Sequence, residues 1–361
     1  MTTAGGFPAP GPQDPEPVWS TSYDGLPPPT GPAMRPSPLP LTAHKPGIVP
    51  LRPLTLGDIL DGAFKAVRFN PKSMVGLSAL VLGAFLVPSA ALGVGATHLL
   101  AGALSRLDPE ARRVLGPGAG DLLGLPSALL QMMFNGLATA LLSGLLIHVV
   151  GQAVLGRKPD LAQTWRSTRG RLPSLLALLL LSGLFGLLVT AVLLGPGALL
   201  LYNRNGAAGG LLLVLGFLAL VVVVWAFSTK ISLAAPAIVL EEHGVLAGLR
   251  RSFALTKGVA FWRVFGITLL AAVIAGIAGS LLAAPFSAIG YVIQKMAGQD
   301  AESGAIGVTF TSHLGALLSG AITTPFVAAV TGLLYIDRRM RLEALDVVLL
   351  REAQTNPAPR I

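Results

Sequence analysis

Six long runs of apolar residues divide the sequence between residues 74 and 336. They lie near residues 74–100, 127–153, 173–195, 209–234, 262–289 and 310–336. A helix rises about 1.5 Å per residue and the hydrocarbon core of a bilayer is about 30 Å thick, so about 20 apolar residues cross it. Only 12% of the 361 residues are charged, about half the share in soluble domains. The pattern predicts an all-α polytopic membrane protein with six transmembrane helices.

The loops between these runs differ in charge. One set of loops carries most of the lysines and arginines: Arg52, Lys65, Arg68, Lys72, Arg157, Lys158, Arg166, Arg169, Arg171, Arg250, Arg251, Lys257, Arg263, Arg338, Arg339, Arg341 and Arg351. The other set holds five bases and five acids: Arg106, Arg112, Arg113, Arg204, Lys295, Asp108, Glu110, Asp121, Asp300 and Glu302. The net charge of +9 therefore falls on the first set. The positive-inside rule places that set, and both termini, in the cytoplasm, and no nucleic-acid partner is expected.

The two ends of the chain differ from its middle. Residues 1–50 contain fourteen of the 28 prolines, and such a composition cannot bury enough apolar surface to fold. We expect a disordered, proline-rich cytoplasmic tail, which is either a tether or a docking segment for a proline-reading domain. A six-span membrane domain at residues 51–345 and a short cytoplasmic tail at residues 346–361 follow. No apolar run precedes residue 73, so the first span is expected to be the insertion signal.

Three short segments share an aromatic residue followed four positions later by a base: Phe64–Arg68, Trp165–Arg169 and Phe253–Lys257. The first begins with Thr55 and Asp58, which have the spacing of a capping box. Such amphipathic helices suit the plane of the membrane interface. One interpretation is a unit of interfacial helix, span, turn and span used three times. The alternative is that each segment is only the basic flank of a cytoplasmic loop.

Basic residues of this surface are the candidate contacts for anionic lipid headgroups, each contributing about 1 kcal/mol. They are Arg68, Lys72, Arg169, Arg171, Arg250, Arg251, Lys257, Arg338 and Arg339. Small residues recur every fourth position in the last two spans, which lets helices approach closely in lipid. The candidate packing residues are Ala275, Gly279, Ala316 and Gly320, and they would join these spans to each other, to neighbours or to a second copy of the chain.

A few polar residues interrupt the spans. Lys230 is expected to extend its side chain to the headgroups, and the histidines near span ends, His313 among them, are expected to be solvated. Gln131 and Asn135, one helical turn apart, would either bond a neighbouring helix or line a polar cavity. Between the first two spans, Asp108 and Pro109 predict the start of a short helix.

Motifs of catalysis and cofactor binding are missing from the sequence. It has no phosphate-binding lysine loop, no nucleophile elbow, no zinc-protease motif and no pair of histidines with metal-ligand spacing. There is no cysteine, which excludes thiol catalysis. We therefore expect no catalytic residue, no cofactor and no metal, and the chain is not expected to be an enzyme.

Three segments resemble a known family: RPLTLGDILDGAFKAVRFNPK (52–72), APAIVLEEHGVLAGLRRSFALTKG (235–258) and LLYIDRRMRLEALD (333–346). They are similar to the membrane domain of bacterial glycerophosphoryl diester phosphodiesterases, which is common in high-GC Gram-positive bacteria. The resemblance covers about residues 50–345 and implies a multi-pass protein of the bacterial plasma membrane. In that family hydrolysis belongs to a separate soluble barrel of about 250 residues. Only a short tail follows the sixth span here, so no catalytic residue carries over.

Two functions fit these observations. The first is a non-enzymatic membrane module that engages anionic lipid of the cytoplasmic leaflet, or a partner protein, through its basic face. The second is a transporter or channel for a small solute or lipid, which is indicated by prolines inside the spans (Pro88, Pro285 and Pro325) and by the polar residues Gln131, Asn135 and Lys230. A lipid phosphodiesterase is a third hypothesis.

Overall fold

The computed structural model describes residues 47–108, 122–203, 206–298 and 300–343. The chain divides into two compact units, Met1–Thr42 and Ala43–Ile361, and every described residue belongs to the second. All regular elements of the described residues are helices, which confirms the predicted all-α class. The proline-rich tail, the short helix expected after Asp108 and the tail at residues 346–361 lie outside the described residues.

Six of the helices are long and apolar enough to cross a membrane, as the sequence predicts. They are α2 (Leu77–Ser105), α4 (Leu125–Val154), α6 (Leu172–Tyr202), α7 (Gly206–Ile231), α10 (Val259–Ala297) and α11 (Ala301–Glu343). The last two are longer than their apolar runs, with 39 and 43 residues. At about 1.5 Å per residue α11 measures about 65 Å, so it extends well beyond a bilayer core of about 30 Å.

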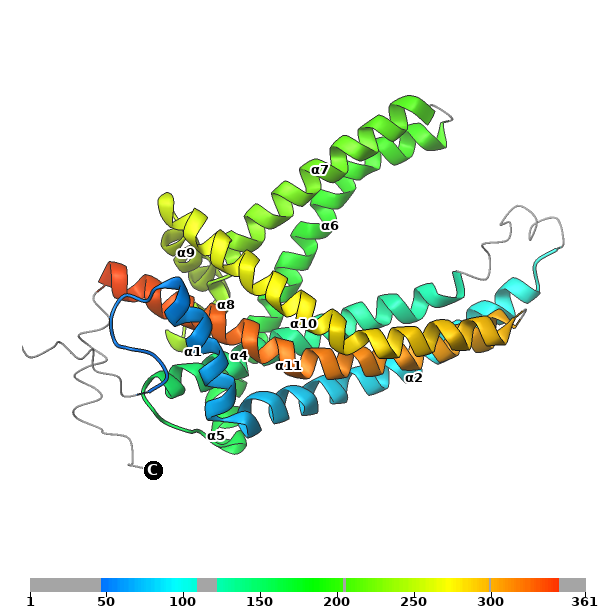
Figure 1. The fold of residues 1–361 in the computed structure, drawn as a ribbon. Coiled ribbons are helices and arrows are strands. Elements are labelled where there is room, and N and C mark those ends of the chain that lie inside the picture. The colour runs from blue at the N-terminus through cyan, green and yellow to red at the C-terminus, as the bar shows by residue number, and fades with distance from the viewer. Residues whose placement is uncertain (1–46, 109–121, 204–205, 299, 344–361) are drawn as a thin grey trace, which may run out of the picture. The chain divides into compact units, whose positions relative to one another are not determined.

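Short helices gather at one end of the long ones, which we call the basic end (Figure 1). They are α1 (Leu56–Phe69), α5 (Leu161–Thr168), α8 (Ala234–Leu240) and α9 (Val245–Leu255). The expected capping box starts α1, where the Asp58 N–H donates to the Thr55 hydroxyl (3.1 Å) and the Thr55 N–H donates to the Asp58 carboxylate (3.0 Å). Gly258 has a φ of +64°, a conformation that glycine adopts without steric cost, and there the chain turns from α9 into α10.

The core of the molecule forms around α11, which packs along α10, α2, α4 and α1. Half of the apolar window of α11 is buried inside the protein, whereas only 6% is buried in each of α6 and α7. These two helices pack mainly on each other. As they leave the basic end they diverge from the paired helices α10 and α11 (Figure 1). In a membrane, the surface of this hairpin would therefore be in contact mostly with lipid.

The glycines of the two small-residue stripes lie against different helices. A Cβ added to Gly279 on α10 would lie 2.7 Å from the Ser319 hydroxyl oxygen of α11. A Cβ added to Gly320 on α11 would instead lie 2.8 Å from a methyl carbon of Leu82 on α2. Ala275 and Ala316 pack partly buried against the core. The stripe on α10 thus faces α11, while the glycine of the α11 stripe faces α2.

Candidate functional site at the basic end

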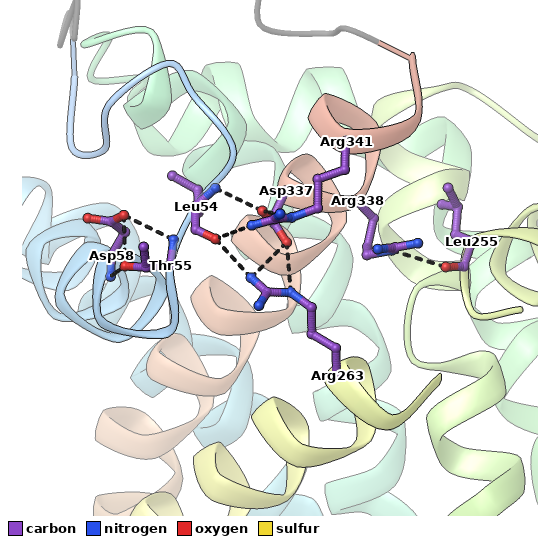
Figure 2. Close-up of polar contacts among 8 residues, drawn as sticks. All are labelled: Leu54, Thr55, Asp58, Leu255, Arg263, Asp337, Arg338 and Arg341. Atoms are coloured by element: carbon purple, nitrogen blue, oxygen red, sulfur yellow. Dashed lines mark hydrogen bonds and ion pairs between the residues drawn. The ribbon is translucent and has the colours of Figure 1, made fainter. Parts of the chain in front are cut away.

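A fully buried carboxylate, Asp337 on α11, lies at the centre of the basic end. Its Oδ1 accepts the backbone N–H of Leu54 (2.8 Å) and the Nε–H of Arg341 (2.9 Å), and its Oδ2 pairs with Nη2 of Arg263 (3.1 Å). Figure 2 shows these contacts converging from the segment before α1, from α10 and from α11. Burying a charge is costly unless it is paired and hydrogen-bonded. Here both carboxylate oxygens have such partners.

The same two arginines also hold the backbone of the segment that precedes α1. The Leu54 carbonyl accepts from Nη2 of Arg263 (2.8 Å) and from Nη2 of Arg341 (2.7 Å) (Figure 2). This segment, residues 47–54, is called the strap below. Its apolar side chains are buried in the core: Ile48, Val49, Leu51 and Leu54. The packed part of the chain therefore includes residues 47–50, which the sequence analysis assigned to the tail.

At its other end the strap lies against α4. The Ile48 N–H donates to the Ala153 carbonyl (3.3 Å). A Cβ added to Gly47 would lie 2.2 Å from that carbonyl oxygen and 2.4 Å from the Val154 carbonyl oxygen. A side chain cannot fit at this distance, so glycine is required for the strap to approach α4.

A second carboxylate cluster forms around Glu241, which directly follows α8. Its carboxylate pairs with Nε of Arg251 (3.0 Å), with Nε of Arg339 (3.1 Å) and with Nε2 of His243 (3.1 Å), and it accepts the hydroxyl of Tyr335. Burial alone would raise the pKa of Glu241. The hydrogen bonds from Tyr335 and Arg251 and the charge of Arg339 outweigh burial and hold this pKa below its ordinary value. Glu241 is therefore ionised at neutral pH.

Glu343, at the end of α11, completes this cluster. It pairs with Arg251 and with Arg339 (3.0 Å), so both arginines lie between two carboxylates. Burial alone would lower the pKa of Arg251, but its hydrogen bonds to the carboxylates of Glu241 and Glu343 raise it above the ordinary value. The cluster ties the end of α8 and the middle of α9 to the end of α11.

The three sequence segments with the family resemblance meet at these two clusters. Segment 52–72 contributes the Leu54 backbone, segment 235–258 contributes Glu241 and Arg251, and segment 333–346 contributes Asp337 and Arg339. Figure 2 shows one further link, in which Nε–H of Arg338 donates to the Leu255 carbonyl (3.2 Å) at the end of α9. The three segments therefore supply most residues of the two carboxylate clusters, which together are called the framework of the basic end below.

The nine candidate lipid contacts separate into two groups. Four are bonded inside the protein: Arg251 and Arg339 in the Glu241 cluster, Arg338 to Leu255, and Arg171 in an ion pair with Glu242. The other five have exposed side chains: Arg68, Lys72, Arg169, Arg250 and Lys257. No ion pair to another described residue holds any of these five. Only the second group is free to meet a ligand without breaking the framework.

Exposed rings accompany these exposed bases on three helices. Phe64 on α1, Trp165 on α5 and Phe253 on α9 are 48%, 46% and 42% exposed, although apolar rings of this size are normally buried. In each case an exposed base follows one helical turn later, at Arg68, Arg169 and Lys257. The Phe64 ring also packs against the ring of Phe326 on α11 (centroids 4.8 Å apart).

Two polar residues of the spans differ from their predictions. Lys230 does not extend to the surface, because its Nζ donates to the Thr256 carbonyl (3.0 Å) and lies over the Phe261 ring. His313 is not solvated but 5% exposed, with Nε2 at 3.1 Å from the Ser89 hydroxyl and Nδ1 at 2.7 Å from the Thr309 carbonyl. Both predictions were wrong because hydropathy does not register contacts between helices, here from Lys230 on α7 to Phe261 on α10 and from His313 on α11 to Ser89 on α2.

Comparison with known proteins adds no family assignment. Among the described residues there is no group of three or more acidic, histidine or cysteine side chains that could hold a metal ion. No family model matches the chain, no curated protein matches it, and no solved structure matches it. The interpretation of the basic end therefore depends on its own geometry.

Proposed function

We propose that this chain is a non-catalytic membrane module that gathers anionic lipid headgroups at its basic end. The observation that supports it is the threefold pairing of an exposed ring with an exposed base, at Phe64 and Arg68, Trp165 and Arg169, and Phe253 and Lys257. In this proposal the basic end faces the cytoplasm of a bacterial cell, both termini are cytoplasmic, and the membrane is the plasma membrane. The segment resemblance and the one-sided positive charge support this setting.

The physical argument starts from where such side chains are stable. Aromatic rings partition to the boundary between headgroups and acyl chains, and neighbouring bases reach the phosphates. Each base near an anionic surface contributes about 1 kcal/mol of attraction. The buried Asp337 and the partly buried Glu241 neutralise the inner arginines and fix the positions of α1 and α9. The five outer bases are then left for lipid.

Lipid selectivity provides the test. An equimolar mixture of phosphatidylglycerol and phosphatidylcholine would be added to the full chain in mild detergent. Native mass spectrometry would then count the bound lipids of each kind. We expect phosphatidylglycerol to exceed phosphatidylcholine several-fold. Replacing the base of each pair by glutamine (Arg68→Gln, Arg169→Gln and Lys257→Gln together) should lower the ratio markedly, because three of the five exposed bases, each contributing about 1 kcal/mol of attraction, are removed.

A matched control removes a base from the other end of the molecule. Arg106→Gln changes an exposed arginine directly after α2 that lies far from the three pairs and lines neither cavity described below, and it should leave the ratio unchanged. Equal binding of the two lipids by the unmodified chain would exclude headgroup selection, and an equal loss in the Arg106→Gln protein would exclude the basic end as its site.

A further inference from the structure

A groove runs along the membrane-spanning part of the molecule. Helices α4 and α10 each pack along α11 but hardly touch each other, so they form the two walls of a groove whose floor is α11. Two cavities lie in this groove, and each is lined by residues of all three helices.

The first cavity lies at the end opposite to the basic end, beside the turn between α10 and α11. It has a volume of about 690 Å³ and is lined by Gln131 of α4, Gln294, Lys295 and Tyr291 of α10, and Ser312 of α11, among others. The Lys295 ammonium lies 5.4 Å from the centre of the Tyr291 ring. This mouth of the groove thus combines one cation with amide and hydroxyl groups, which suits a phosphate and its polar substituent.

The second cavity lies nearer the basic end, where α7 joins the walls. It has a volume of about 460 Å³ and a mostly apolar surface, and the hydroxyl-bearing residues along it include Thr139, Ser143, Ser228, Thr268, Thr323 and Thr331. Several of these hydroxyls donate to a carbonyl of their own helix, as Thr268 does to Val264 and Thr323 to Ser319. Their oxygens can still accept a further hydrogen bond. The cavity therefore offers scattered hydroxyl acceptors in a mostly apolar lining without a charge.

A polar stripe on α4 joins the two cavities. Gln131 lines the first cavity, Thr139 and Ser143 line the second, and Asn135 lies between them, each four residues from the next. Residues four apart share one face of a helix. The amides of Gln131 and Asn135 have no hydrogen-bond partner among the described residues. Polar side chains inside a membrane are costly and normally face a partner or a polar pathway.

The groove is open along its side. Asn135 and Thr139 are exposed, and the α6–α7 hairpin diverges from α10 and α11 instead of closing over them (Figure 1). A pathway for a solute or an ion must be enclosed by protein on all sides, since the acyl chains of the lipids would otherwise enter it. A lipid needs only a polar stripe along the protein for its headgroup, because its acyl chains can stay in the bilayer.

We propose that this groove carries the headgroup of a glycerophospholipid from one leaflet to the other, while its acyl chains stay in the bilayer between α10 and the α6–α7 hairpin. Lys295 meets the phosphate at one mouth, and the amides and hydroxyls of α4 and α11 replace its water along the path. This activity uses different residues from the headgroup selection at the basic end and does not depend on it.

Lipid passage can be measured in vesicles of phosphatidylcholine with a trace of phosphatidylcholine that carries a nitrobenzoxadiazole dye on one short acyl chain, so that its headgroup is unchanged. Dithionite added outside destroys only the dye that it reaches, so about half of the signal disappears from protein-free vesicles. With the full chain inserted we expect nearly all of it to disappear. Vesicles that contain a soluble form of the dye in the lumen should keep that signal, because dithionite itself does not pass.

Groove variants connect the activity to the stripe. Asn135→Leu, Thr139→Val and Ser143→Ala together should slow lipid passage about tenfold, because the headgroup loses its hydrogen-bond partners. Ala272→Phe adds bulk at an exposed position of the second cavity and should slow it as well. Ser182→Ala with Thr190→Val on α6, which line neither cavity of the groove, should leave the rate unchanged, and elution as one symmetric peak in size-exclusion chromatography shows that each variant is folded.

The outcomes are distinct. Loss of only half of the lipid signal with the unmodified chain would overturn the proposal, and so would an unchanged rate in both folded groove variants. Loss of the luminal dye would overturn it in favour of a pathway for solutes. Because the vesicles are neutral, a negative result here would leave the selection of anionic lipid at the basic end untouched.

Discussion

Asp337→Asn is expected to destabilise the protein by about 3 kcal/mol, since removal of one partner from a buried ion pair leaves the others uncompensated. In the folded state the carboxylate accepts from the Leu54 backbone, Arg263 and Arg341. The substituted amide is neutral, and its NH₂ group would face donors where an acceptor is needed. Thermal unfolding in detergent should show a fall in melting temperature on the order of 10 °C.

A matched control changes a carboxylate that is paired but exposed. Asp61 on α1 forms an ion pair with Lys65, and its side chain is 60% exposed. Exposed pairs contribute roughly 0–1 kcal/mol, so Asp61→Asn should shift the melting temperature by only about 1 °C. A similar shift for both variants would mean that Asp337 is not the centre of the basic end.

Gly47→Ala should release the strap and destabilise the protein by about 3 kcal/mol or more. The added Cβ would lie 2.2 Å and 2.4 Å from the carbonyl oxygens of Ala153 and Val154. Backbone atoms at a helix end cannot move away cheaply, so the strap must lift and expose Ile48 and Val49, which are 5% and 1% exposed. Full burial of each such side chain contributes about 1.5–3 kcal/mol. Limited proteolysis should then cut the chain before α1 much faster than in the unmodified protein.

Gly95→Ala is the corresponding control, because a Cβ there meets nothing within 4 Å and the residue lies inside α2. Alanine is favoured over glycine in a helix by about 0.5–1 kcal/mol, so this variant should be as stable as the unmodified chain or slightly more so. Rapid cleavage in the Gly95→Ala protein, or slow cleavage in the Gly47→Ala protein, would contradict the packing of the strap.

The spans and the capping box at Thr55 and Asp58 could be predicted because both depend on residues near each other in the sequence. A run of apolar residues fixes the length of a helix in lipid, and a capping box joins positions only three apart. The aromatic and basic pairs at Phe64, Trp165 and Phe253 were likewise readable from spacing, and the structure leaves their rings about half exposed.

The strap and most contacts of the carboxylate clusters could not be predicted, because they join distant parts of the chain. Leu54 bonds a residue 283 positions away, and Tyr335 bonds one 94 positions away. A signal was present nevertheless, since Asp337 is a lone acid beside Arg338, Arg339 and Arg341. A count of the bases in each loop does not distinguish the bases that neutralise a buried acid from the bases that face lipid.

The structure therefore divides the positive charge of the basic end into two parts. Part of it neutralises the buried carboxylate of Asp337 and the partly buried carboxylate of Glu241, and this part fixes α1, α9, α10 and α11 relative to one another. The exposed remainder is available for lipid. In the proposed function the framework keeps the three aromatic and basic pairs at one end, and the lipid groove begins at the other.

Single cysteines at the two ends test the central claim, which is that six helices cross the membrane with the basic end inside the cell. The chain has no cysteine of its own, so Ala247→Cys on α9 and Ala301→Cys at the start of α11, both at exposed positions, would each carry the only thiol. A membrane-impermeant maleimide added to intact bacterial cells should label the Ala301→Cys protein at once and the Ala247→Cys protein only after permeabilisation. Labelling of both proteins from one side, or the reverse order, would contradict the account.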